Sequence, residues 1–329
     1  MGIDLDGLSF TEMIQLQTQL ASELKRRFER QLAFVFSDVV GSTQYFARFG
    51  DVAGRALQQR HLDLLDQVLK LHGGRLVDTA GDGAFSVFPS IEAATGAMEL
   101  LEAFITTQNA GYGRDDQLAV RVGMHWGLAL TDGKTVSGDA VNLCARINGT
   151  CQPGEIRLTR QAFGQLEPAR RLRCTGLPPV ALKGITEPTA ILIYEWRDAS
   201  RFPTRVRVRE TGEEVRLPAQ DLIAFGRLRE QNGIPANDVV LMLPDPLQAQ
   251  QVSRWQFELR RQTQGFVLRA ISEQPNWVDG VLVAKGHEAP VRPGTVVQVA
   301  KVLTLEFLAD PRRDSSGSSA DTTLFPVLR

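Results

Sequence analysis

The spacing of apolar and polar positions changes three times along this 329-residue chain. In residues 9–30 apolar side chains recur at three- and four-residue steps, and Ser9 and Glu12 fit a capping box. The pattern predicts one amphipathic helix within an N-terminal segment of residues 1–31. Such a helix can pack on its own domain or pair two protomers as a short coil, and the repeat is too short to decide between them.

Residues 32–198 alternate apolar runs with longer amphipathic segments. Four runs predict strands, and they begin at Leu32, Arg75, Ala84 and Leu118. The segments between them predict helices over 52–73 and 90–108. This β-α-β-β-α-β order predicts an α+β, ferredoxin-like domain. Beyond it we expect a further helix over 138–148 and a closing pair of strands within 173–196.

The C-terminal third has a different texture. Residues 204–310 hold many short runs of β-branched and aliphatic residues separated by glycine, proline and asparagine, which predicts a β-sandwich. Residues 199–203 are expected to form a linker. The polar, serine-rich segment 311–329 is expected to be a disordered tail.

Composition narrows the class of protein. With 43% hydrophobic and 23% charged residues the chain is typical of a soluble globular protein. A formal net charge of -1 offers no electrostatic case for nucleic acid or an anionic membrane as a partner. There is neither a long apolar run nor a basic-then-apolar N-terminus. The cysteines, without metal-ligand spacing, suggest reduced thiols and a cytoplasmic protein; they are Cys144, Cys151 and Cys174.

Two aspartates carry the first chemical signal. Asp38 follows the first predicted strand and Asp82 occupies the turn of the next hairpin. The first and third strands of a ferredoxin-like sheet are neighbours, so the two carboxylates can meet. Charges about 4 Å apart would repel by roughly 4 kcal/mol at an effective dielectric of 20, a penalty that a divalent cation removes. Mg²⁺ prefers one or two carboxylates together with phosphate oxygens.

The residues after Asp38 fit the same chemistry. Gly41, Ser42 and Thr43 lead toward a helix whose free N–H groups suit a polyphosphate. The pattern therefore indicates metal-dependent nucleotide chemistry. Either aspartate alone is more simply explained as a helix cap or a turn residue, and a palm-like polymerase or nuclease would fit the pair equally well.

Five ordered blocks separate these options. The stretches "FVFSDVVGST", "GGRLVDTAGDGAFSVF", "VRVGMHWG", "SGDAVNLCARIN" and "LKGITEPTAILIYEW" resemble class III nucleotidyl cyclases over about residues 32–197. The resemblance implies a homodimer with active sites at the subunit interface. It also implies conversion of a purine nucleoside triphosphate to a 3',5'-cyclic nucleotide and pyrophosphate.

The resemblance assigns roles by motif. Asp38 and Asp82 match the two metal-binding aspartates, and the carbonyl of Val39 is the expected extra ligand for two Mg²⁺ or Mn²⁺ ions. Asn142 and Arg146 match the residues that act on the ribose and on the α-phosphate at the transition state.

Three further positions concern phosphate and base recognition. Lys183 matches a lysine that contacts the terminal phosphates. Adenylate cyclases of the family usually carry lysine where this chain has Asp78, and the customary partner position is Thr135. A carboxylate accepts from guanine N1–H and the 2-amino group, and a threonine donates to O6. We expect a preference for GTP or tolerance of both purines; the alternative is a base pocket that has decayed.

The C-terminal region resembles a forkhead-associated domain, which binds phosphothreonine peptides. Arg227 and Ser253 match its phosphate-binding pair, and Asn276 is the candidate for the asparagine that binds the peptide backbone, unless Gln274 replaces it. Gln256 stands where the family has histidine. The alternative is a sandwich that binds a protein surface without phosphate.

Together these features predict a cyclase that a phosphorylated protein partner regulates or localises. A second hypothesis is a non-enzymatic adaptor, in which the first domain senses a nucleotide or only dimerises.

Overall fold

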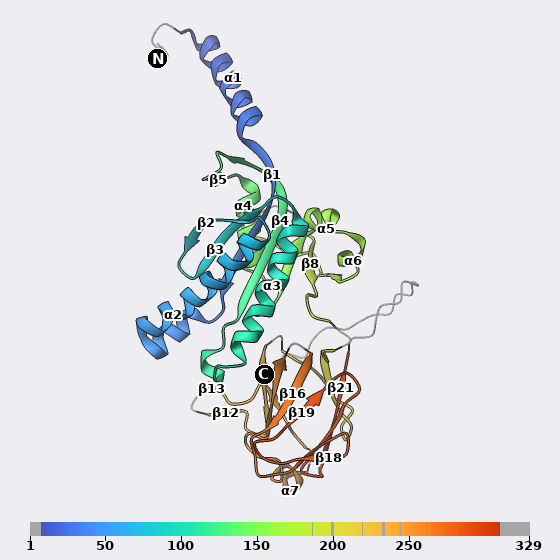
Figure 1. The fold of residues 1–329 in the computed structure, drawn as a ribbon. Helices are drawn as coiled ribbons and strands as arrows, with labels where there is room; N and C mark the ends of the chain where they lie inside the picture. The colour runs from blue at the N-terminus through green and yellow to red at the C-terminus, as the bar shows by residue number, and fades with distance from the viewer. Residues whose placement is uncertain are drawn as a thin grey trace.

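The computed structural model describes residues 8–185, 187–198, 201–218, 220–231, 234–243, 245–262 and 264–309 (Figure 1). The expected tail over 311–329 lies outside these residues. Within the described residues, no helix is both long and apolar enough to cross a membrane.

Helix α1 (Phe10–Phe28) begins with the capping box that the sequence predicts. The Ser9 side chain accepts from the Glu12 N–H, and the Glu12 carboxylate accepts from the Ser9 N–H. None of its residues is buried, and in Figure 1 the helix projects from the rest of the chain. The helix therefore does not pack on its own domain, and pairing of two protomers stays a prediction.

An eight-stranded sheet forms the centre of the N-terminal part. Its strands are β1 (Glu29–Val39), β2 (Arg75–Ala80), β3 (Gly83–Phe88), β4 (Val120–Thr131), β5 (Val136–Ser137), β6 (Ile156–Thr159), β7 (Cys174–Gly176) and β8 (Ile191–Tyr194). The order is β2-β3-β1-β4-β6-β8-β7, with β5 paired to β4. Strand β1 runs antiparallel to both β3 and β4, which gives the predicted ferredoxin-like arrangement of the first four strands.

Helices cover the two faces of this sheet. They are α2 (Ser42–Leu71), α3 (Ile91–Asn109), the 3-10 turn η1 (Arg114–Asp116), α4 (Asp139–Asn148), α5 (Arg160–Gln165) and α6 (Pro168–Arg171). The apolar faces of α2 and α3 pack against Ala33 and Val35 of β1 in the main core. Phe34 points to the other face and packs in a smaller cluster with Cys144 of α4. Because side chains alternate along a strand, Asp38 lies on the α4 face.

The C-terminal part is a β-sandwich, as the sequence predicts. One sheet has the order β10-β9-β21-β20-β17-β18 and the other β14-β11-β15-β16-β19. Their strands are β9 (Arg205–Val208), β10 (Glu214–Arg216), β11 (Leu222–Gly226), β14 (Val239–Val240), β15 (Phe257–Gln262), β16 (Gly265–Ala270), β17 (Asn276–Val278), β18 (Val281–Val283), β19 (Glu288–Val291), β20 (Val296–Val299) and β21 (Leu303–Leu308). Side chains from both sheets share one hydrophobic core.

Smaller elements complete the sandwich. Strands β12 (Glu230–Gln231) and β13 (Ile234–Pro235) pair with each other, and α7 (Pro246–Ala249) is a single short turn. Within the segment expected to be a linker, Phe202 is buried and its ring packs edge-on against Phe266 at 5.5 Å. The sandwich core therefore already includes residue 202.

Candidate active site

The register of the central strands brings Asp38 and Asp82 together. Asp38 is the cross-strand partner of Gly83, and Asp82 occupies the adjacent turn together with Gly81, whose φ of 63° suits glycine. Burial raises the pKa of the Asp38 carboxyl, the Arg121 guanidinium opposes that shift, and the neighbouring Asp82 raises the pKa further. Two acids thus share one rim of the sheet.

Each of the two aspartates has a protein partner. Arg121 lies opposite Asp38 in the register of β4 and β1, and its Nε donates to Asp38 Oδ2 at 2.9 Å. The Ser42 hydroxyl donates to Asp82 Oδ2. Ser42 is the first residue of α2, directly after Gly41, which has a left-handed φ of 72°, and Thr43 is exposed. The start of α2 therefore lies beside the acid pair, where its N–H groups suit an anion.

A cavity of about 610 Å³ opens beside this pair. Asp78 and Thr135, the two positions expected to read the base, line it together with Asp38 and Asp82. Its lining also includes apolar side chains, and these are Phe36, Val77, Phe85, Val136 and Val141. The rings of Phe36 and Phe85 stack with centroids 4.6 Å apart. Acids and an aromatic surface thus border one space large enough for a nucleotide.

The base-reading positions are exposed and partly engaged. Asp78 Oδ1 accepts from the Thr79 N–H at 2.8 Å, which leaves its second oxygen available. The Thr135 hydroxyl donates to Asp132 at 3.0 Å. Lys134 also lines the cavity, a residue that motif comparison missed because the family's lysine stands at the position of Asp78. Its place beside Thr135 was the available signal.

Asn142 and Arg146 lie one turn apart on α4, as predicted from their spacing. The Arg146 guanidinium packs on Gly184, where a Cβ would come within 3.3 Å of its Nη2. That contact places Arg146 beside the exposed Lys183. Among the described residues that line the cavity, Asn142, Arg146 and Lys183 are absent. The structure therefore groups the site residues into two separate sets.

A buried histidine contacts the residue that precedes Asp38. His61 of α2 is 0% exposed, and its Nε2 lies 3.0 Å from the Ser37 hydroxyl, next to Asp38. Burial lowers the pKa of His61 to about 4, against the opposing effect of Asp82, so the ring is neutral at pH 7. The residue was missed in the sequence. Its position in the apolar repeat of α2, four residues after Leu57 and three before Leu64, was the signal.

The donors at this rim fit a hard divalent cation. Carboxylate oxygens of Asp38 and Asp82, with the neighbouring carbonyl of Val39, are the ligand types that Mg²⁺ and Mn²⁺ prefer. In the part of the chain that the structure describes, no group of three or more histidine, cysteine or acidic side chains could hold a metal. A cation here would therefore need phosphate or water oxygens as well.

The sandwich loops place Arg227 and Ser253 side by side. The Arg227 N–H donates to the Ser253 carbonyl at 3.0 Å, and the Arg227 side chain is exposed. Asn276 is 0% exposed and its Oδ1 accepts from Gln256 Nε2 at 3.0 Å, so its assignment to the peptide backbone stays a prediction. Gln274 is exposed in the preceding loop and is the residue that could reach a peptide.

Comparison with known proteins gives a consistent picture. The family model of the adenylate and guanylate cyclase catalytic domain matches residues 25–194. Putative adenylate cyclase 3 of Rhizobium meliloti (strain 1021) is 24% identical over 216 residues, which cover 66% of this chain and 36% of that protein. Adenylate cyclase 2 of the same organism is 29% identical over 221 residues, which cover 61% of this chain and 59% of that protein. The chain thus spans less than two thirds of either relative.

Solved structures include similar chains. An adenylate/guanylate cyclase/hydrolase from Silicibacter pomeroyi is 24% identical with a TM-score of 0.46, and the match covers 50% of this chain and 96% of that one. An adenylate cyclase from Trypanosoma brucei is 20% identical with a TM-score of 0.45, covering 50% of this chain and 90% of that one.

Proposed function

This chain belongs to the adenylate and guanylate cyclase catalytic domain family, and we propose that it converts a purine nucleoside triphosphate to the 3',5'-cyclic monophosphate and pyrophosphate. The observation that carries the proposal is the meeting of Asp38 and Asp82 at the rim of a cavity of about 610 Å³. A protein that only bound partners would gain nothing from two acids whose charges oppose each other.

We assign the binding of Mg²⁺ or Mn²⁺, two ions per site, to Asp38, Asp82 and the Val39 carbonyl. When bound, such ions lower the pKa of the ribose 3'-hydroxyl and neutralise the leaving pyrophosphate. The α2 start at Gly41, Ser42 and Thr43 holds the polyphosphate through its N–H groups. His61 keeps Ser37 in place behind Asp38, and this neutral support adds no further charge to the site.

The base lies between the apolar wall and the polar residues at the mouth of the cavity. Asp78 accepts from guanine N1–H and the 2-amino group, and Thr135 donates to O6 once its hydroxyl turns away from Asp132. Lys134 offers a donor for the adenine N1 acceptor, which supports tolerance of both purines with GTP favoured. Mispairing one buried polar group costs about 1–3 kcal/mol, enough to change the preferred base.

A second copy of the chain would complete the reaction centre. Asn142, Arg146 and Lys183 lie outside the cavity wall that holds the acid pair, so a single chain does not gather the two sets. In a homodimer, Asn142 orients the ribose and Arg146 meets the charge that develops on the α-phosphate. The split between the two sets supports this arrangement.

The sandwich is proposed to bind a phosphothreonine-containing partner. The exposed Arg227 and the neighbouring Ser253 offer a guanidinium and a hydroxyl to a phosphate dianion. Their loops follow Gly226 of β11 and precede β15. A bound partner would localise the cyclase or change how its protomers pack.

We further propose a cytoplasmic location. Cys144, Cys151 and Cys174 are free thiols, which fits a reducing compartment. Nucleoside triphosphate substrates are also made there.

The decisive assay incubates the purified chain with Mn²⁺ or Mg²⁺ and either ATP or GTP, and identifies products by mass. Wild-type protein should release a cyclic nucleotide and pyrophosphate. Asp38→Asn and Asp82→Asn should each lower kcat by at least about 100-fold, whereas Asp66→Asn on the exposed face of α2 should not. Absence of cyclic product with every metal and base would leave the adaptor hypothesis.

A further inference from the structure

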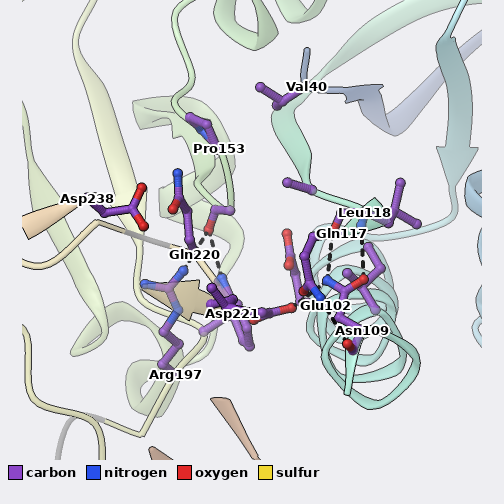
Figure 2. A pocket seen from close by; sticks show the side chains of 15 residues that line it. Val40, Glu102, Asn109, Gln117, Leu118, Pro153, Arg197, Gln220, Asp221 and Asp238 are labelled. Atoms are coloured by element: carbon purple, nitrogen blue, oxygen red, sulfur yellow. Dashed lines mark hydrogen bonds between the residues drawn. The ribbon is translucent and has the colours of Figure 1, made fainter. Parts of the chain in front are cut away.

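A largely buried aspartate of the sandwich, Asp221, forms hydrogen bonds to the cyclase domain. Asp221 lies directly before β11, and its Oδ2 accepts from Asn109 Nδ2 at 2.8 Å (Figure 2). Its Oδ1 accepts from the Thr106 hydroxyl at 3.2 Å. Thr106 and Asn109 form the last turn of α3 and are only 7% and 3% exposed. The Asp221 carboxylate therefore binds two side chains of the last turn of α3.

Asn109 also holds the chain segment that enters β4. Its Nδ2 donates to the Leu118 carbonyl at 2.8 Å, and its Oδ1 accepts from the Leu118 N–H at 2.9 Å. These two hydrogen bonds hold Leu118, which lies two residues before β4 begins. One amide side chain thus joins Asp221 of the sandwich to the entry of β4.

The entry of β4 is bonded to the acid pair's strand. The Val40 N–H donates to the Ala119 carbonyl at 2.9 Å, two residues after Asp38. Arg121, two residues after Ala119, donates to Asp38 itself. Val40, Leu118 and Ala119 line the cavity of about 250 Å³ that separates the two domains beside Asp221.

A second route reaches the same strand from Arg261 of β15. This arginine is 4% exposed, its Nε lies 2.9 Å from Asp221 Oδ1, and its guanidinium lies 5.3 Å from the Trp196 ring centre. Trp196 Nε1 donates to the Gly154 carbonyl at 2.9 Å, and the Gly154 N–H donates to the Val120 carbonyl at 2.7 Å. Both routes therefore end on residues 118–120.

The interface buries ionisable groups from both domains. Glu102 of α3 is 4% exposed and faces Asp221, Arg197 and Arg261. Removing Asp221 is expected to be destabilising, because the buried Arg261 would stay desolvated without its ion-pair partner. The contact is thus a specific interface rather than an incidental touch between domains.

We propose that Asp221 is a positioning residue for the cyclase reaction: through Asn109 it holds the entry of β4, and so it sets where Arg121 and Asp38 lie. The sandwich is then required for full metal binding even when no phosphorylated partner is present. This inference rests on the proposed function for its catalytic consequence, although the mechanical link is independent of it.

The test compares Asp221→Ala with wild type in the full chain, first without metal. Amide hydrogen exchange over residues 118–121 should become about 10-fold faster or more. Calorimetric Mn²⁺ titration in the presence of a non-reactive triphosphate analogue should show about 10-fold weaker binding, as for other residues that orient metal ligands. Asp245→Ala is the matched control; it removes an aspartate hydrogen bond from the start of α7 and should change neither reading.

Two variants keep the test decisive if Asp221→Ala unfolds. Thr106→Val removes only the 3.2 Å bond and should speed exchange about 2- to 3-fold. Asn109→Ala, which keeps Asp221 and its contact with Arg261 but removes the bonds to Asp221 and Leu118, should speed exchange at 118–121 about 10-fold or more. Unchanged exchange at 118–121 in folded variants would overturn the proposal. If wild type makes no cyclic nucleotide, the proposed function fails, while the exchange result still decides the mechanical link.

Discussion

Arg121 and Asp38 are register partners on β4 and β1, and the arginine Nε lies 2.9 Å from Asp38 Oδ2. The guanidinium therefore occupies one oxygen of the acid that should hold the metal. A divalent cation must share this oxygen with a positive neighbour, and that neighbour also opposes the rise in the pKa of Asp38 that burial causes. The same guanidinium thus favours the ionised form of Asp38, and it would lower the affinity of the proposed metal site.

Arg121→Gln should tighten metal binding. Loss of a positive charge beside Asp38 removes a competitor worth about 1 kcal/mol, so the half-saturating Mn²⁺ concentration should fall roughly 5-fold at pH 7.5. Calorimetric titration measures this directly. Arg157→Gln is the control. It breaks the ion pair between Arg157 and the Glu155 carboxylate and should leave the half-saturating Mn²⁺ concentration unchanged. A higher Mn²⁺ requirement in Arg121→Gln would mean that the positioning of Asp38 by the arginine outweighs the repulsion between the arginine and the metal.

Asp78→Lys should change the preferred base. The ammonium would donate to adenine N1 and face the N1–H donor of guanine, so the ratio of ATP to GTP turnover should rise at least about 10-fold. Initial rates with both nucleotides measure it. Thr79→Lys adds the same charge on the opposite face of β2 and should leave the ratio unchanged. A strong preference of the unmodified protein for ATP would contradict the guanine assignment.

Glu102→Gln should flatten the pH dependence of stability. Burial raises the pKa of Glu102 from 4.5 to about 8, so between these values the folded protein holds a proton that the unfolded chain has lost. The free energy of unfolding therefore falls by about 1 kcal/mol per pH unit as pH rises through this window. In Glu102→Gln the free energy of unfolding should not fall in this way as pH rises.

Urea unfolding at pH 5, 6.5 and 8 measures the difference. Relative to wild type, Glu102→Gln should gain about 3 kcal/mol between pH 5 and 8. His61 and His125, whose pKa values burial lowers to about 4, act in the opposite direction below pH 6.5 but are present in both proteins. The exposed Glu273→Gln should run parallel to wild type. A parallel curve for Glu102→Gln would show that its carboxyl is ionised in the fold.

Arg227→Ala should abolish phosphate-dependent binding by the sandwich. Loss of a charge-assisted contact should weaken a phosphothreonine peptide by at least about 10-fold in fluorescence anisotropy, while the unphosphorylated peptide stays unaffected. Arg229→Ala, an exposed neighbour, is the control. Strand β11 pairs with β15 from Leu222 to Phe225. Asp221 precedes the start of β11 and Arg227 follows its end, so the two residues lie at opposite ends of the strand. Equal affinity of Arg227→Ala and wild type would favour a phosphate-independent surface.

The order of elements and the acid pair could be predicted because both depend on local patterns. Alternating apolar runs fixed the strands, and the ferredoxin-like order required the strand before Asp38 to adjoin the hairpin of Asp82. The capping box at Ser9 predicted one helix start, and the Ser9 side chain accepts the expected N–H bond. The cap that Ser90 provides for α3 was not predicted. These features follow from spacing within a few residues.

Other features depend on packing between distant segments. Arg121 meets Asp38 only through the register of β1 and β4, which no single stretch reveals. Asn276 is polar but buried, because Gln256 satisfies its oxygen inside the sandwich. Glu102 did leave a signal: it lies on the apolar stripe of α3 with Met98, Leu101 and Ile105, where a charge indicates a buried partner. Its partners in the second domain could not be read from the helix.

A crystal of the chain grown with Mn²⁺ and a non-reactive nucleoside triphosphate analogue would test the catalytic assignment most directly. We predict anomalous scattering peaks within about 2.5 Å of carboxylate oxygens from both Asp38 and Asp82, with the triphosphate beside the start of α2. Carboxylates that point apart, with no manganese between them and the nucleotide bound elsewhere, would contradict the assignment.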